Sequence, residues 1–309
     1  MKSAVIWMDG EFVAYEQAAV HVLSPSIHYG VGVFEGLRCY ATDQGPAVFR
    51  LREHLERFLD SIHILGFREF EYSVEDLRQA VHKTILINGF EECYIRPVMY
   101  LDGPLGLDMD RSRPRVGIAA WEWGPYLGME AREKGIHMMV SSYTRLHPNI
   151  NMSKAKISGN YANSMLVKTL ALRSGYDEAV ILDPQGFVAE CTGENLFMLR
   201  RGVLYTPPLA TILEGITRDT VIQLAVDLGI PVEEMRITRD QLYIADEVFI
   251  TGTAAEIVGA RMIDFRAVGD GIVGRITRQL LDAYLDTVHG KGRRSPEWLD
   301  YVQQAEPAV

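Results

Sequence analysis

The pattern of apolar and polar positions in residues 1–123 changes repeatedly between the strand period and the helix period. Two short apolar segments flank the turn signal Asp9-Gly10, which is typical of a hairpin. Ser73 and Asp76 occupy capping positions before an apolar run at helical spacing that stops at Asn88-Gly89. The expected strands are 4–8, 11–15, 93–101 and 115–123, and the expected helices are 51–65 and 73–87.

Residues 124–135 are marked by proline and glycine, which predicts an interdomain linker. The expected later strands are 136–144, a pair about the turn 183–186, and 246–252, and the expected helices are 160–174, 217–229 and a last amphipathic one. The pattern therefore predicts a mixed α/β fold of the α+β type with mostly hairpin-type sheets. Its two domains are expected at 1–123 and 136–309.

Composition narrows the class of protein. The chain has 309 residues, 48% of them hydrophobic, which is enough to bury a large core. A formal net charge of −10 argues against nucleic acid or an anionic membrane as a partner. Acidic residues near the start do not fit a signal peptide, and no run of about 18 apolar residues predicts a membrane span, so we expect a cytoplasmic protein. The three scattered cysteines, Cys39, Cys93 and Cys191, predict neither a disulfide framework nor a metal site.

Glycines at 30, 32 and 36 nearly spell the G-x-G-x-x-G fingerprint of NAD-dependent oxidoreductases. The third glycine falls one position late, and Glu35 stands where it should be. The following residues alternate and break at Gly45-Pro46 like strand, turn and strand, so no helix N-terminus is expected for a pyrophosphate. The context therefore argues against a dinucleotide site.

Lysine is scarce, yet Lys154 and Lys156 lie together just ahead of the helix expected from residue 160. Ser158 is the expected N-cap, which would place Lys156 near the positive end of the helix dipole. That field favours a neutral, nucleophilic amine. A solvated loop lysine is the alternative.

Three further features complement an amine nucleophile. Glu190 ends a strand only one helix and one hairpin after Lys156, and a carboxylate there can hold a pyridinium nitrogen protonated. Gly215-Ile216-Thr217 opens a helix and Thr251–Ala254 follows a strand, so both are candidate anion cradles, with ordinary caps or turns as the alternative. An amine, a carboxylate and anion cradles together are what pyridoxal 5′-phosphate requires.

Seven motifs in the same order resemble the fold-type IV pyridoxal-phosphate aminotransferases, most closely the branched-chain amino-acid aminotransferases. They are HYGVGVFEGLRCY, EHLERF, YIRP, KISGNYANS, AECTGENLF, EGITRDT and ADEVFITGTAAEI. The resemblance implies a small α/β N-terminal domain and a larger pseudo-barrel C-terminal domain that binds the cofactor. By the same resemblance Lys156 forms the Schiff base and moves the proton, and Glu190 pairs with the pyridine nitrogen. The other implied cofactor contacts are the phosphate-binding Arg57, Gly215, Ile216, Thr217 and Thr253, and Tyr161 at the phenolic oxygen.

The implied reaction moves the amino group of leucine, isoleucine or valine to 2-oxoglutarate, which requires an apolar pocket with a few polar groups. The residues expected to contact substrate are Tyr29, Phe34, Arg38, Tyr94, Arg96, Trp123, Tyr126, Gly252, Thr253 and Ala254. For the aromatic residues, plain core packing is the alternative.

The loop Pro104–Met109 departs from the G-M-G-V-N-P-like loop usual in branched-chain enzymes. D-amino-acid transaminases, (R)-amine transaminases and aminodeoxychorismate lyases of the same fold are therefore alternatives. From other classes, an NAD-dependent oxidoreductase and a non-catalytic small-molecule binder stay open. The resemblance also implies a homodimer or larger homo-oligomer, in which this loop and the Tyr29 segment approach a neighbouring active site.

Overall fold

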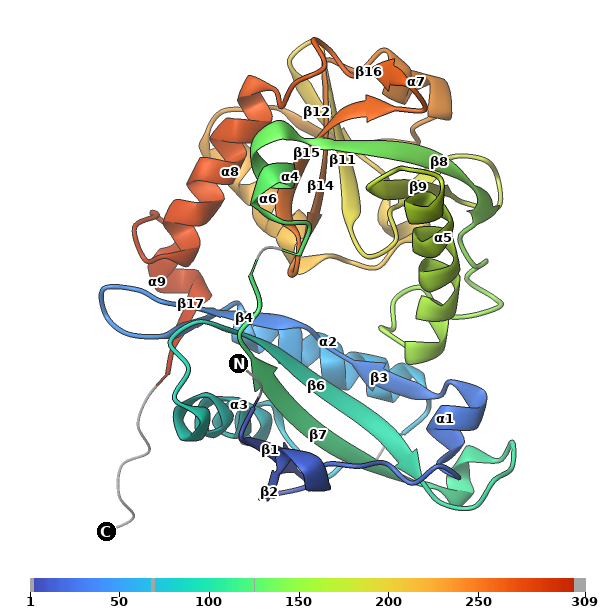
Figure 1. Ribbon diagram of the computed structural model, residues 1–309, viewed down its shortest axis with the longest axis vertical. Coiled ribbons are helices and arrows are strands. Elements are labelled where there is room, and N and C mark those ends of the chain that lie inside the picture. Colours follow the sequence, from blue (N-terminus) through green and yellow to red (C-terminus); the bar gives the residue numbers. More distant parts are fainter. Residues whose placement is uncertain (1–2, 68–69, 125, 303–309) are drawn as a thin grey trace. The chain divides into compact units, whose positions relative to one another are not determined.

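The computed structural model describes residues 3–67, 70–124 and 126–302, which form two compact units (Figure 1). The first unit contains the described residues up to Trp123 together with 155–159 and those from Thr287 onward. The second contains the described residues of 124–154 and 160–286. The short segment 155–159 is therefore bonded at both ends to residues of the second unit. The linker at 124–135 stays a prediction.

Antiparallel pairing builds the whole sheet of the first unit. Its strands are β1 (Val5–Met8), β2 (Glu11–Ala14), β3 (Gly32–Phe34), β4 (Leu37–Tyr40), β5 (Ala47–Phe49), β6 (Cys93–Asp102), β7 (Arg113–Trp121) and β17 (Leu299–Tyr301). The order is β17-β5-β4-β6-β7-β1-β2, and β3 pairs with β6. The helices are α1 (Pro25–Tyr29), α2 (Leu51–Ile64), α3 (Val74–Asn88) and α9 (Ser295–Trp298).

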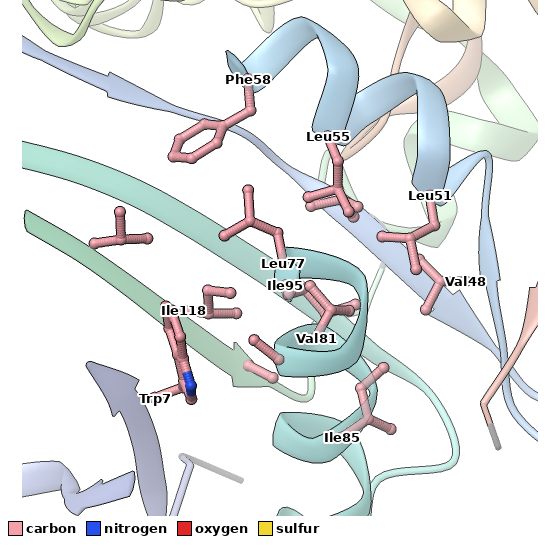
Figure 2. Close-up of a cluster of buried hydrophobic side chains, with 14 of the residues drawn as sticks. Trp7, Val48, Leu51, Leu55, Phe58, Leu77, Val81, Ile85, Ile95 and Ile118 are labelled. Atoms are coloured by element: carbon pink, nitrogen blue, oxygen red, sulfur yellow. The ribbon is translucent and has the colours of Figure 1, made fainter. Parts of the chain in front are cut away.

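Helices α2 and α3 pack side by side on one face of this sheet (Figure 2). Leu55 and Phe58 of α2 and Val81 of α3 are fully buried against strand residues such as Ile95. Each such side chain contributes about 1.5–3 kcal/mol by leaving water. The Ser73–Asp76 capping box and the left-handed Gly89 fix the ends of α3 as predicted.

The second unit is built on a mixed sheet that curls into a half-barrel. Its strands are β8 (Ile136–Thr144), β9 (Glu178–Leu182), β10 (Val188–Glu190), β11 (Asn195–Arg200), β12 (Val203–Thr206), β13 (Val232–Glu234), β14 (Glu247–Gly252), β15 (Glu256–Ile263) and β16 (Arg266–Ala267). The order is β10-β9-β8-β15-β14-β11-β12-β13, and β16 pairs with β15. The pairs β8–β9, β15–β8 and β12–β13 are parallel.

Helices lie between the strands of the second unit along the chain. They are α4 (Met129–Lys134), α5 (Tyr161–Arg173), α6 (Ile216–Asp227), α7 (Arg239–Tyr243) and α8 (Arg275–Val288), whose last residues fall in the first unit. Because β8 and β9 are parallel, they need a crossover, and α5 provides it. Val167 and Ala171 of α5 are buried against β9.

The structure corrects some local expectations. Ser158 is not the N-cap of α5: it begins a 3₁₀ turn, Ser158–Asn160, and Asn160 holds the N-cap position. Helix α1 was not expected, although Ser24 caps it and Pro25 stands at its first position. Helix α4 forms inside the stretch expected to be a linker.

Candidate active site

The structure divides the predicted site residues between the two units. The first holds Tyr29, Phe34, Arg38, Arg57, Tyr94, Arg96, Trp123 and Lys156. The second holds Tyr126, Tyr161, Glu190, Gly215, Ile216, Thr217, Gly252, Thr253 and Ala254.

The segment that carries Lys156 runs beside β3. The Phe34 N–H donates to the Lys156 carbonyl at 3.2 Å, and the Gly159 N–H donates to the Gly30 carbonyl at 2.9 Å. Gly30 has φ of 71°, and a Cβ there would lie only 3.2 Å from the Gly159 Cα. The glycines of the near-fingerprint thus allow two backbones to approach closely, and strand β4 follows them where a nucleotide-binding helix would begin.

Lys156 is held through its backbone and lies over an aromatic ring. Its N–H donates to Ser61 Oγ at 3.0 Å, and Ser61 in turn donates to the Arg57 carbonyl at 2.8 Å. The Lys156 Nζ lies 5.0 Å from the Phe34 ring centroid. Ser61 therefore connects one turn of α2, which carries Arg57, to the backbone of Lys156. Arg57 is the predicted phosphate-binding residue, and Lys156 is the predicted Schiff-base lysine.

Arg57 is fixed by a buried carboxylate that sequence reasoning missed. Its Nε and Nη2 donate to the two oxygens of Glu35 at 2.7 and 2.9 Å. Glu35 is fully buried, at the break between β3 and β4, and His54 Nδ1 lies 2.8 Å from its second oxygen. Burial alone raises the pKa of a carboxyl, but Arg57 and His54 hold the pKa of Glu35 well below its usual range.

All the predicted substrate residues of the first unit except Tyr29 form one connected aromatic and cationic cluster. The Tyr94 ring contacts Trp123 edge-on at 4.8 Å between centroids, and Arg96 Nη2 donates to the Tyr94 hydroxyl at 3.1 Å. Arg96 also lies 4.7 Å from the Phe34 ring centroid, and buried Arg38 donates to the Trp123 carbonyl at 3.2 Å. Arg96 thus lies over the rings of both Phe34 and Tyr94.

Two further positions bear on this cluster, Gly36 beside Tyr94 and the predicted substrate residue Tyr29. A Cβ at Gly36 would overlap the Tyr94 hydroxyl, so the glycine leaves room for that ring. Tyr29 lies at the end of α1 and is 44% exposed.

Glu190 lies buried in the second unit within a dense polar network. Its Oε1 forms an ion pair with Arg145. Its Oε2 accepts from Asn195 Nδ2 and from the Leu213 N–H, each at 3.3 Å. The same Asn195 amide donates to the Leu213 carbonyl at 3.1 Å, which ties Glu190 to the residues ahead of α6.

The N-terminus of α6 has the form of an anion cradle. Gly215 is the N-cap, so no side chain caps the first N–H groups, and Thr217 is buried at the second helical position. A Cβ at Gly215 would overlap the Asn195 amide oxygen. Glycine at this position is therefore what lets the Asn195 side chain pack against the cradle.

The second cradle, at 252–254, lies beside buried acids. The Cβ position of Gly252 is 3.4 Å from Glu194 Cγ, and the Ala254 carbonyl accepts from the Tyr126 N–H at 3.4 Å. Burial and the neighbouring Glu178 raise the pKa of Glu194 to about 8. Lys168 donates to Glu178 at 2.6 Å and lies 5.5 Å from the Tyr126 ring centroid, so it offsets one of the two acids.

Tyr161 is the first residue of α5 and is partly exposed.

Several structural partners of the predicted residues had no local sequence signal. Glu35 is 22 residues from Arg57, and Arg145 is 45 residues from Glu190. Asn195 and Glu194 lie within the AECTGENLF motif and are buried. Polar residues at positions where a buried strand is expected were the one sequence signal for these two partners.

Each unit, taken by itself, contains groups whose chemistry fits part of pyridoxal 5′-phosphate. In the first unit, the Arg57 guanidinium is a group of the kind that binds phosphate. In the second unit, the uncapped start of α6 offers N–H groups for an anion, and the buried Glu190 carboxylate has the chemistry to pair with a protonated ring nitrogen. The Thr251 hydroxyl is buried and has no hydrogen-bond partner within the described residues. In the described part of the chain no group of three or more His, Cys, Asp or Glu is placed to hold a metal, and no helix is long and apolar enough to cross a bilayer.

Residues 32–263 match the family model of amino-transferase class IV. The chain therefore belongs to the class IV aminotransferases. The class and fold expected from the seven motifs are confirmed.

Similar proteins of known name narrow this class further. The branched-chain-amino-acid aminotransferase of Pseudomonas aeruginosa is 46% identical over 303 residues, which are 98% of each chain. The crystal structure of the Escherichia coli branched-chain amino acid aminotransferase is 44% identical with a TM-score of 0.95 and covers 98% of this chain and 100% of that one. A T.th. branched-chain amino acid aminotransferase complexed with N-(5′-phosphopyridoxyl)-L-glutamate is 45% identical with a TM-score of 0.93, covering 98% and 100%. These relatives do not favour the D-amino-acid, (R)-amine or NAD-dependent alternatives.

Proposed function

We propose that this aminotransferase moves the amino group of leucine, isoleucine or valine to 2-oxoglutarate, with pyridoxal 5′-phosphate as its cofactor. The observation that carries the proposal is the 46% identity to a branched-chain enzyme over 98% of both chains. The complex of the T.th. relative contains the phosphopyridoxyl group joined to L-glutamate, the amino acid that 2-oxoglutarate becomes.

The cofactor, when bound, supplies an electron sink that weakens the Cα–H bond of the amino acid. Lys156 would be the amine that attaches the cofactor, and its freed amine would accept the proton that leaves Cα. Glu190, oriented by Arg145 and Asn195, would pair with the protonated ring nitrogen of the cofactor. Tyr161 would form a hydrogen bond with the phenolic oxygen of the cofactor.

The proposed phosphate-binding groups are the Arg57 side chain, Thr217 with the N–H groups of Gly215 and Ile216, and Thr253. The macrodipole of α6 favours an anion at its start, which supports this role. Substrate binding is assigned to the aromatic and cationic cluster of the first unit, to Tyr29, and to Tyr126 and residues 252–254 of the second unit. Phe34, Trp123 and Tyr126 provide apolar walls, while the remaining polar groups receive carboxylates: Tyr29, Arg38, Tyr94, Arg96 and the N–H groups of Gly252, Thr253 and Ala254.

A homodimer, or a larger assembly of such dimers, is part of the proposal. Exposed apolar side chains gather on α1 and on the loop after β6: Ile27 is 56% exposed, Leu105 42% and Leu107 87%. Single exposed apolar residues are common, but a group of them supports an interface. Cytoplasmic location stays a prediction.

The test follows the cofactor absorbance band of the loaded protein on adding L-leucine, D-leucine or an (R)-amine. A band shift with L-leucine alone supports the proposal, and a shift only with the D-amino acid or the amine contradicts it. Borohydride reduction and peptide mapping then locate the attachment. Lys154, which pairs with Glu214 at 2.8 Å, is the internal control, and a label there instead of on Lys156 refutes the assignment.

Sedimentation and activity measured over one dilution series test the assembly. Activity lost in step with dissociation supports a shared site. A fully active monomer contradicts it.

A further inference from the structure

The Glu35 carboxylate is the centre of a buried polar group in the first unit. Both of its oxygens are engaged by Arg57 at 2.7 and 2.9 Å, and the second oxygen also lies 2.8 Å from His54 Nδ1. Side-chain exposure is 0% for Glu35, 1% for His54 and 14% for Arg57. Of the three side chains, that of Arg57 is the most exposed.

Burial decides which of these three side chains carry a charge. Burial lowers the pKa of His54 in spite of the hydrogen bond to Glu35, with Arg57 and Lys156 acting in the same direction. A neutral His54 donates one N–H to the carboxylate and adds no charge. The pair Glu35–Arg57 is therefore a one-to-one ion pair that His54 holds in place.

Stability alone does not explain such a pair. Removing two charges from water costs about as much as their attraction returns, so buried ion pairs add little to the free energy of folding. A two-point contact between a guanidinium and a carboxylate does fix the plane of the guanidinium. What the structure gains is therefore one orientation of the Arg57 side chain.

The orientation is coupled to the segment that carries Lys156. Ser61, one turn after Arg57 on α2, donates to the Arg57 carbonyl and accepts from the Lys156 N–H. The Phe34 N–H, next to Glu35, donates to the Lys156 carbonyl. Glu35 and Arg57 thus lie on the two elements that hold this segment.

We propose that Glu35, held by His54, is a positioning residue that orients Arg57 to receive the phosphate of the cofactor. The inference rests on the proposed function, in which Arg57 binds that phosphate. Glu35 itself touches neither cofactor nor substrate in this role. It acts only through the direction of the Arg57 donors.

The same unit contains a matched control. Asp300 of β17 binds Arg78 through two contacts of 2.7 and 2.9 Å and lies 2.9 Å from His82 Nε2. The chemistry is again arginine, carboxylate and histidine, here with a buried His82 and partly exposed Arg78 and Asp300. Nothing in the proposed function involves Asp300, so Asp300→Asn measures the effect of breaking such a group without a link to the cofactor.

The experiment compares the apoprotein's affinity for pyridoxal 5′-phosphate with its affinity for pyridoxal, which lacks the phosphate. Glu35→Gln is expected to weaken binding of the phosphate form by about 10- to 100-fold, the usual loss for a hydrogen bond to a charged group. Pyridoxal affinity is expected to stay within about twofold, since it reports the site without the phosphate contact. Asp300→Asn is expected to leave the ratio of the two affinities at the wild-type value.

Further variants keep the test decisive. In an Arg57→Gln background, Glu35→Gln is expected to add no further loss, because Arg57 is the only route of its effect. If Glu35→Gln does not fold, Glu35→Asp replaces it in the experiment. Aspartate keeps the negative charge, but its shorter side chain moves the carboxylate away from Arg57. An unchanged affinity ratio in a folded Glu35 variant overturns the inference. A wild-type protein that binds no pyridoxal 5′-phosphate overturns the proposed function first, so the two failures are distinguishable.

Discussion

Replacing Glu194 by glutamine is expected to remove a pH dependence of stability from the second unit. Glu194 is 5% exposed and accepts the Gly193 N–H at 3.0 Å. Burial and the nearby Glu178 raise its pKa from 4.5 to about 8, and Lys168 offsets this only in part. Between these two values the folded protein keeps the proton while the unfolded chain releases it. Stability from this group is therefore full below pH 4.5 and is lost as the pH rises towards 8.

The magnitude follows from the pKa difference. Each pKa unit corresponds to about 1.4 kcal/mol, so a rise from about pH 5 to about pH 8 costs the wild-type protein about 4 kcal/mol at this residue. Glutamine resembles the protonated acid in shape and hydrogen bonding, and it does not ionise. We expect Glu194→Gln to match the wild type near pH 5 and to exceed its stability increasingly at higher pH.

Urea unfolding at a series of pH values measures this difference. All four tryptophans, Trp7, Trp121, Trp123 and Trp298, lie in the first unit, whereas Glu194 lies in the second. Far-UV circular dichroism and hydrogen exchange of peptides from 178–200 are the suitable signals. Glu233→Gln, an exposed carboxylate on β13, is the control. If the wild type and Glu194→Gln keep a constant difference from pH 5 to pH 9, Glu194 does not hold its proton and the reasoning is wrong.

Three other substitutions test the site. Gly215→Ala is expected to cost about 1–3 kcal/mol by overpacking against Asn195, seen as a lower melting temperature, and to weaken cofactor affinity; an unchanged affinity would remove α6 from the phosphate site. Gly36→Ala is expected to displace the Tyr94 ring and raise KM for L-leucine more than it lowers kcat; equal KM values would show that Tyr94 does not contact substrate. Glu190→Gln is expected to bind the cofactor but to lose most turnover, because an amide does not stabilise the ring proton; wild-type rates of Cα proton removal would contradict this role.

Elements with a signal inside their own sequence could be predicted. The Asp9-Gly10 turn and the Ser73–Asp76 capping box give β1–β2 and α3 within a residue or two. These signals are backbone effects of neighbouring residues, so they survive without knowledge of the fold. The class of protein was predictable for a different reason, since seven motifs occur in a fixed order.

The partners of the site residues could not be predicted. The contact of Glu35 with Arg57 requires the break between β3 and β4 to face α2, and the contact of Arg145 with Glu190 requires β9 to bring the ends of β8 and β10 together. Both depend on tertiary packing, which leaves no periodic trace in the sequence. The wrong N-cap at Ser158 has the same origin. The residues before α5 form backbone hydrogen bonds with the β3 segment, and a 3₁₀ turn separates them from the helix.

The pairing of β17 with β5 sets the order in which the first unit can be finished during synthesis. Leu299 pairs with Phe49, about 250 residues earlier in the chain. At the usual speed of translation, on the order of 5–20 residues per second, the edge of β5 waits roughly 10–50 s for its partner. During that time an open strand edge is exposed to other nascent chains. A chaperone that shields residues 47–49 until residues 299–301 leave the ribosome would therefore protect this edge from wrong pairing.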